Sequence, residues 1–204
     1  MEMKEYIARN ENRFLEELFE LLRIPSVSAS PDHAADMRKC ASKVAELLLA
    51  AGADTAEVSD TKGNPVVFAE KKFDPKAETV LVYGHYDVMP EAPLDKWKSD
   101  PFEPVIKDGA IYARGANDDK GQHFMHIKVL EYLIRENKLR HNIKFLIEGE
   151  EEIASPNLLE WMKANRKKLA CDIILVSDTT MISEKMPSIN TGMRGLRYMQ
   201  IKGE

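Results

Sequence analysis

Residues 79–87 read TVLVYGHYD, and this stretch decides the fold that the sequence predicts. Its first half is a short run of apolar and β-branched residues, which is typical of a strand buried on both faces of a sheet. A glycine, a histidine, a tyrosine and an aspartate follow at residues 84–87. In open parallel sheets, ligands bind beyond the carboxyl ends of the strands. The polar residues of this segment are therefore the first candidates for a functional site.

Three similar apolar runs predict further strands, and helical periodicity predicts helices before and between them. The predicted strands cover residues 66–68, 79–83, 143–147 and 172–176. The predicted helices cover residues 3–23, 32–51, 119–137 and 155–167, with Asp32 and Gly52 as caps of the second. Strands that alternate with helices predict an α/β fold with three layers, a mostly parallel central sheet with helices on both faces.

Length and composition are those of a soluble globular domain. The 204 residues suffice for one core, and 44% of them are hydrophobic and 31% charged. A net charge of −5 without a long basic run argues against a nucleic-acid partner. We find neither a secretory signal nor an apolar run of membrane-spanning length, so we expect a cytoplasmic protein without a membrane partner. Cys40 and Cys171 are expected to be reduced core thiols, with a disulfide as the alternative.

Acidic residues flank three other predicted elements. Residues 148–152 follow the third strand, residues 177–178 follow the fourth, and residues 118–119 precede the long helix. In the predicted fold they all meet at the edge that carries His85, where like charges would repel unless a cation balanced them. Each segment alone has an ordinary explanation as a solvated strand end, a solvated acidic turn or a helix cap. Their coincidence favours a metal site.

The same motifs occur in an order that resembles a known family. They are GHYDV at 84–88, Trp97 with DPF at 100–102, DG at 108–109, YARG at 112–115 with DDKG at 118–121, EG at 148–149 with EE at 151–152, and SD at 177–178. Their order and spacing are similar to those of the carnosinase, aminoacylase and succinyl-diaminopimelate desuccinylase family of two-metal metallopeptidases. The tryptophan segment and the double aspartate resemble its dipeptidase branch. The resemblance implies a zinc-exopeptidase-like α/β fold.

A set of metal ligands is implied by this resemblance. Two ions about 3.5 Å apart, the usual separation in two-metal sites, would share Asp118. We expect zinc, two ions per complete site, with manganese as the alternative. The peptide bond between Asp118 and Asp119 is expected to be cis. The implied ligands are His85, Asp118, Glu152 and Asp178.

The resemblance also implies a reaction, the hydrolysis of a peptide bond in dipeptides or small peptides. Asp87 would orient His85. A hydroxide bound by both metals would attack the amide, with Glu151 as the general base that passes the proton to the leaving amine. Trp97, Phe102 and Gly109 are interpreted as scaffold. A deacylase of N-acyl amino acids and a non-catalytic metal-binding fragment are the alternative functions.

The end of the sequence departs from the family pattern. The family has a late histidine as a further metal ligand, and none of the five histidines here lies in a suitable segment. We interpret residues 1–187 as the N-terminal part of a catalytic domain and residues 188–204 as the start of a lid and dimerisation domain. Residues 197–202 alternate like a strand, and an edge strand of the first domain is the alternative. We therefore expect a homodimeric parent protein. The 204-residue chain alone should be weakly active or inactive and bind about one metal ion tightly.

Overall fold

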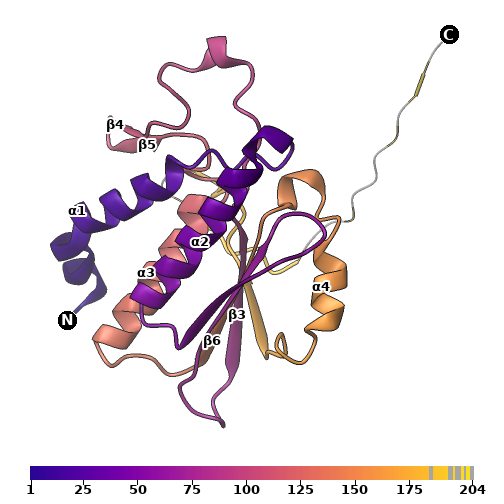
Figure 1. Cartoon of the computed structure of the whole chain (residues 1–204). Coiled ribbons are helices and arrows are strands. Elements are labelled where there is room, and N and C mark those ends of the chain that lie inside the picture. The colour runs from indigo at the N-terminus through magenta and orange to yellow at the C-terminus, as the bar shows by residue number, and fades with distance from the viewer. Residues whose placement is uncertain (184–185, 193–194, 196–198, 200, 203–204) are drawn as a thin grey trace.

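A five-stranded sheet with helices on both faces forms the centre of the computed structural model (Figure 1). The structure describes all residues except 184–185, 193–194, 196–198, 200 and 203–204. The strands lie in the order β1-β2-β6-β3-β7. Their bounds are Thr55–Ser59 for β1, Val66–Lys71 for β2, Thr79–His85 for β3, Asn142–Glu148 for β6 and Ile173–Val176 for β7. This is the three-layered α/β fold that the sequence predicts.

The sheet is mixed, and its parallel part carries the candidate site. β3 pairs in parallel with both β6 and β7, whereas β2 pairs antiparallel with both β6 and β1. The carboxyl ends of β3, β6 and β7 therefore meet at one edge, with His85 opposite Glu148 in the register. A buried apolar run looks alike in either direction, so the sequence pattern alone does not reveal that β2 is antiparallel.

Two hydrophobic cores lie on the two faces of the sheet. Val67 and Ala69 face the larger core, whereas Val66 and Phe68 face the smaller one, because successive side chains of a strand point to opposite faces. Helices α1 (Met3–Leu22), α2 (Ala34–Ala50) and α3 (Lys120–Arg135) cover the larger core, and α4 (Leu158–Ala164) covers the smaller one with Trp161 (Figure 1). Each large aliphatic or aromatic side chain buried in this way contributes about 1.5–3 kcal/mol.

Several local features differ from the sequence-based predictions. Pro31–His33 form a short 3-10 helix and α2 begins at Ala34, so Asp32 lies in this turn instead of capping the helix. Strand β1 was not predicted. Neither was a small hairpin of β4 (Val105–Lys107) and β5 (Ala110–Tyr112), whose turn contains Asp108 and Gly109 at positive φ. The remaining short 3-10 helices are η2 (Leu94–Lys96) and η3 (Glu151–Ile153).

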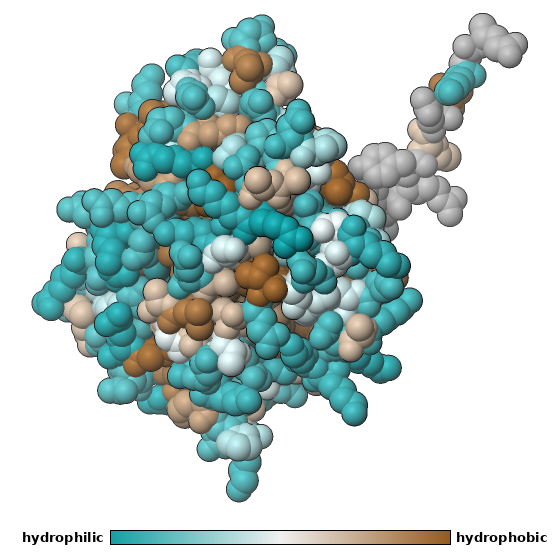
Figure 2. Space-filling view, in the orientation of Figure 1, coloured by the Kyte–Doolittle hydropathy of each residue, from teal (hydrophilic) through white to brown (hydrophobic). Residues whose placement is uncertain are grey.

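The outer surface is mainly hydrophilic on the face shown in Figure 2, with scattered apolar side chains. Cys40 is buried and Cys171 half-buried, and both are free thiols. No helix among the described residues has the length and apolar character needed to cross a membrane. Half of the predicted strand at 197–202, namely residues 197, 198 and 200, falls outside the described residues, and the boundary at residue 187 stays a prediction.

Candidate functional site

His85 is the last residue of β3 and is fully buried. Its Nδ1 lies 3.0 Å from the backbone carbonyl oxygen of Asp87 and 3.3 Å from the carboxylate Oδ1 of the same residue. Both oxygens are acceptors, so Nδ1 is the nitrogen that donates a proton to them. The hydrogen bond fixes the orientation of the ring and directs Nε2 toward the carboxyl edge of the sheet, where it can act as a ligand atom.

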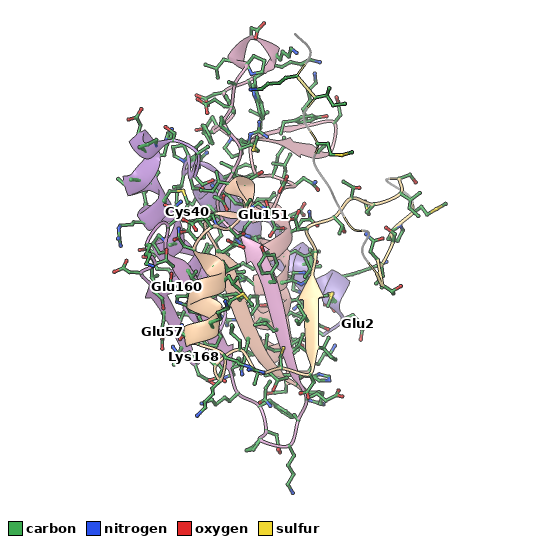
Figure 3. All side chains as sticks on the ribbon, turned by 90° about the vertical axis from the view of Figure 1, so that its right-hand side faces the viewer. Glu2, Cys40, Glu57, Glu151, Glu160 and Lys168 are labelled. Atoms are coloured by element: carbon green, nitrogen blue, oxygen red, sulfur yellow. The ribbon has the colours of Figure 1, made fainter. Side chains whose placement is uncertain are left out.

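Carboxylates from three segments surround the Nε2 atom of His85. It lies 3.0 Å from Asp118 Oδ1, 3.5 Å from Asp178 Oδ2 and 3.9 Å from Glu151 Oε2. His85, Asp118 and Asp178 offer one set of ligand atoms, and His85, Glu151 and Glu152 offer another. Within each set, the atoms all lie within 4.8 Å of one another. Figure 3 shows Glu151 just beyond the ends of the central strands. The structure thus brings together the four residues implied as ligands and the residue implied as base.

The electrostatics of this cluster favour added positive charge. Burial alone would lower the pKa of His85, but the carboxylates of Asp178 and Asp87 outweigh it and raise that pKa to about 12. Burial, together with nearby Asp118, raises the pKa of Glu152 to about 7. Burial also raises the pKa of Glu151, and Asp178 adds to the effect. Imidazole and carboxylate donors in such a field suit a divalent cation such as zinc or manganese, so the donor set fits the implied metals.

Asp87 connects His85 to the turn that carries the implied base. Its carboxylate is fully buried and accepts the backbone N–H of Glu151 at 3.2 Å and that of Glu152 at 3.1 Å. These two residues begin the short helix η3. Asp87 therefore contacts the imidazole with its backbone carbonyl and its carboxylate, and the same carboxylate holds the turn of the two glutamates.

Two further glutamates of the acidic segment have buried structural roles. Glu150 accepts the backbone N–H groups of Asn64 and Asn157, and the side-chain amide of Asn157 as well. Glu148 accepts the hydroxyl protons of Tyr83 and Ser155 on one oxygen, and burial raises its pKa. The alternative explanation of residues 150–152 as a solvated acidic turn is therefore wrong for Glu150, which is buried. No local signal marks these roles, because Asn64 lies 86 residues away from Glu150 in sequence.

The peptide bond between Asp118 and Asp119 is cis, as expected. Asp119 precedes α3, but its carboxylate does not cap the helix. It instead accepts the backbone N–H of His85 at 3.0 Å. A Cβ atom on Gly84 would lie 2.5 Å from Asp119 Oδ2, so only glycine at this position lets the carboxylate approach β3.

Lys120 joins the site to the N-terminal helix. Its ammonium group is completely buried and donates to the backbone carbonyl of Leu21 at 3.2 Å and to that of Ile24 at 2.6 Å. Burial lowers the pKa of Lys120, while the carbonyl oxygens satisfy its protons. The start of α3 is thereby fixed to the end of α1. No sequence pattern indicates this contact, because the partners of Lys120 are backbone atoms about 100 residues earlier.

Comparison with known proteins gives one consistent result. The family model described as peptidase family M20/M25/M40 matches residues 81–191. A protein named a probable di- and tripeptidase from Saccharomyces cerevisiae is 33% identical over 95% of this chain, and human β-Ala-His dipeptidase is 32% identical over 97% of it. The chain spans 24% and 42% of the lengths of these two relatives.

Solved structures agree with this result. A metallo-carboxypeptidase of the M20 family from Sulfolobus solfataricus matches with a TM-score of 0.78 and 37% identity, covering 85% of this chain and 38% of its own. Human carnosine dipeptidase 1 matches with a TM-score of 0.81 and 32% identity, covering 88% of this chain and 41% of its own. The matched residues 81–191 contain the whole cluster around His85. The chain therefore belongs to peptidase family M20/M25/M40.

Proposed function

We propose that the protein hydrolyses the peptide bond of dipeptides or small peptides in a metal-dependent reaction. The observation that carries the proposal is the convergence of one imidazole and four carboxylates at a single sheet edge, in a member of a peptidase family. The names of the relatives, which are di- and tripeptidases or dipeptidases, support the substrate class. The cytoplasmic location and the homodimer stay predictions.

The metals would be zinc ions, with manganese as the alternative, held by His85, Asp118, Glu152 and Asp178. When bound, such ions lower the pKa of water and polarise the amide carbonyl. The side chains of the protein position the ligands and transfer the proton. Asp87 holds His85 in the orientation that leaves Nε2 free for binding, and the Asp119 carboxylate accepts the backbone N–H of His85.

Glu151 is the proposed general base. Its carboxylate lies within 3.9 Å of His85 Nε2 and is only partly buried, so it can reach a water molecule and a substrate. Burial and the neighbouring carboxylates raise its pKa, which suits a group that takes a proton from water and gives it to the leaving amine. The hydrogen bonds from Glu151 and Glu152 to Asp87 keep this turn in place during both transfers.

The test combines hydrolysis of cysteinylglycine and β-alanylhistidine with titration of zinc or manganese. Because the 204-residue chain alone should be weakly active or inactive, hydrolysis is measured on the parent protein that the sequence leads us to expect. There Glu151→Gln should lower kcat about 100-fold or more while metal affinity is retained, because the variant loses proton transfer but no implied ligand. His85→Ala should weaken metal binding itself. Glu11→Gln, on the exposed side of α1, is the matched control. Turnover by Glu151→Gln at the wild-type rate would refute the assignment of the base. A panel of N-acyl amino acids in the same assay distinguishes the deacylase alternative.

A further inference from the structure

Asp178 reaches the site from the most exposed part of the sheet. It follows β7, which pairs with β3 alone among the described strands and whose four residues are all exposed. Figure 3 shows β7 at the open side of the sheet. The β3–β7 pairing ends at Tyr83 and Val176, so the backbone ladder does not extend to Asp178. Some other contact must keep its carboxylate 3.5 Å from His85 Nε2.

His126 makes such a contact from the neighbouring helix. Its Nε2 lies 2.5 Å from Ser177 Oγ, a single hydrogen bond whose donor depends on the tautomer of the ring. No other side-chain hydrogen bond links Ser177 to a different element within the described residues. Burial lowers the pKa of His126, which keeps the imidazole neutral and able either to donate or to accept.

The helix that carries His126 is a rigid support. Phe124 and Ile127, on either side of this residue, are buried in the larger core beneath the sheet. At its N-terminal end α3 is fixed by the contacts of Lys120 with the end of α1. Ser177 is bonded to an element anchored at two points, whereas β7 has one neighbouring strand among those that the structure describes.

We propose that His126 is a positioning residue, which holds Ser177 and thereby keeps Asp178 in place as a ligand of the site. The inference rests on the proposed function only in naming Asp178 a metal ligand. The hydrogen bond to Ser177 constrains the segment whether or not an ion is bound. The hydrogen bond from His126 on α3 thus limits the movement of the segment after β7, and with it the movement of Asp178.

The first measurement needs no metal. Hydrogen–deuterium exchange of the full chain should be faster at residues 177–180 in His126→Ala than in the wild type, with the strands β3 and β6 unchanged. His141→Ala is the control, because it removes a histidine at the other end of the strands, just before the start of β6. Unchanged exchange at residues 177–180 would overturn the proposal.

The second measurement is a zinc titration of the same variants. Ligand-orienting partners typically alter metal affinity 10–100-fold, so we expect about a tenfold loss in His126→Ala and in Ser177→Ala. The double variant should bind zinc no more weakly than either single variant, because both substitutions remove the same hydrogen bond. His126→Gln, which retains a polar group, should restore part of the affinity, and the midpoint of thermal unfolding should change little.

Two failures are distinguishable in this design. Losses of affinity that add in the double variant, or wild-type affinity in His126→Ala, would refute the role of His126 while leaving the proposed metal site intact. A wild-type chain that binds no zinc, or binds it equally well after His85→Ala, would refute the proposed function. In that case the exchange measurement still decides whether His126 positions the segment.

Discussion

Asp87 shows how a buried carboxylate can do more than orient one ligand. Its oxygens accept N–H groups from two residues of η3 and lie beside the imidazole of His85. Each unpaired buried donor costs about 1–3 kcal/mol. Loss of this side chain would leave two such donors without partners and would also remove the carboxylate beside the ring, leaving the backbone carbonyl of Asp87 as the acceptor of Nδ1.

We therefore predict that Asp87→Ala affects stability and metal binding together. The free energy of unfolding in urea should fall by roughly 2–5 kcal/mol, and zinc affinity should fall about 10–100-fold. Asp87→Asn should be intermediate, because its amide retains one acceptor oxygen but turns an NH2 group toward a backbone donor. Asp95→Asn, at an exposed position in η2, is the control. Zinc affinity equal to that of the wild type in Asp87→Ala would contradict this account.

Single residues also show where sequence-based reasoning succeeds. His85, Asp118 and Asp178 could be placed at one edge because each lies next to the end of a predicted element, and the fold fixes where those ends meet. The roles of Asp119, Glu150 and Lys120 could not be predicted. Each depends on a hydrogen bond to a backbone atom far away in sequence, and residue type carries no information about such a partner.

At the scale of elements, the contact between α1 and α3 is organised around one buried charge. Glu131 accepts the hydroxyl proton of Tyr6 at 2.8 Å and the guanidinium of Arg13 at 2.5 Å, and Lys128 lies 3.2 Å away. Burial alone would raise the pKa of Glu131, but these donors outweigh it and lower the pKa to about 2. The two helices thus share a charge that is stable only while its partners remain in place.

This arrangement predicts a pH dependence with a definite sign. The pKa of Glu131 is lower in the folded chain than the value near 4.3 of an unfolded chain, so the contribution to stability is complete above pH 4.3 and is lost as the pH falls toward 2. In urea unfolding, Glu131→Gln should be less stable than the wild type at pH 7. The difference should narrow by roughly 2 kcal/mol between pH 6 and pH 3.

Glu11→Gln provides the comparison, since Glu11 is exposed on α1, the helix that carries Tyr6 and Arg13. The free energy of unfolding of this variant should equal that of the wild type over the whole range of pH. If the free energies of unfolding of Glu131→Gln and the wild type differed by the same amount at every pH, the carboxylate would not be preferentially ionised in the folded state.

Elements with a strong apolar pattern in the sequence were predicted, and those without one were missed. The long helices and the strands β2, β3, β6 and β7 have apolar runs or a clear helical period. The missed strand β1 has the sequence TAEVS and is mostly exposed, so its pattern is weak. The hairpin of β4 and β5 is likewise largely exposed, and its strands have three residues each. The antiparallel direction of β2 depends on its neighbour and not on its own residues.

At the scale of the whole molecule, β7 presents an apolar edge. Its residues Ile173–Val176 are all exposed, and Ile174 has 64% of its surface accessible. Unpaired strand edges with apolar side chains promote self-association. We predict that the 204-residue chain associates in a concentration-dependent manner, measured by light scattering, and that Ile174→Lys reduces this association. Ile189→Lys, in an exposed segment outside any strand, should have little effect. Equal scattering by the two variants would exclude β7 as the cause.

The acidic groups at the carboxyl edge of the sheet also affect the order in which cations and peptides would bind there. Charges of one sign within a Debye length attract cations from solution before any contact forms, so an ion is captured in a steered encounter. Its association rate constant falls as ionic strength rises, whereas its escape depends on short-range bonds and changes little. A peptide that approaches with a negative carboxyl terminus is slowed by the same field until cations have neutralised it. Under the proposed function, we therefore expect a kinetic sequence at this edge, with ions first and peptide second.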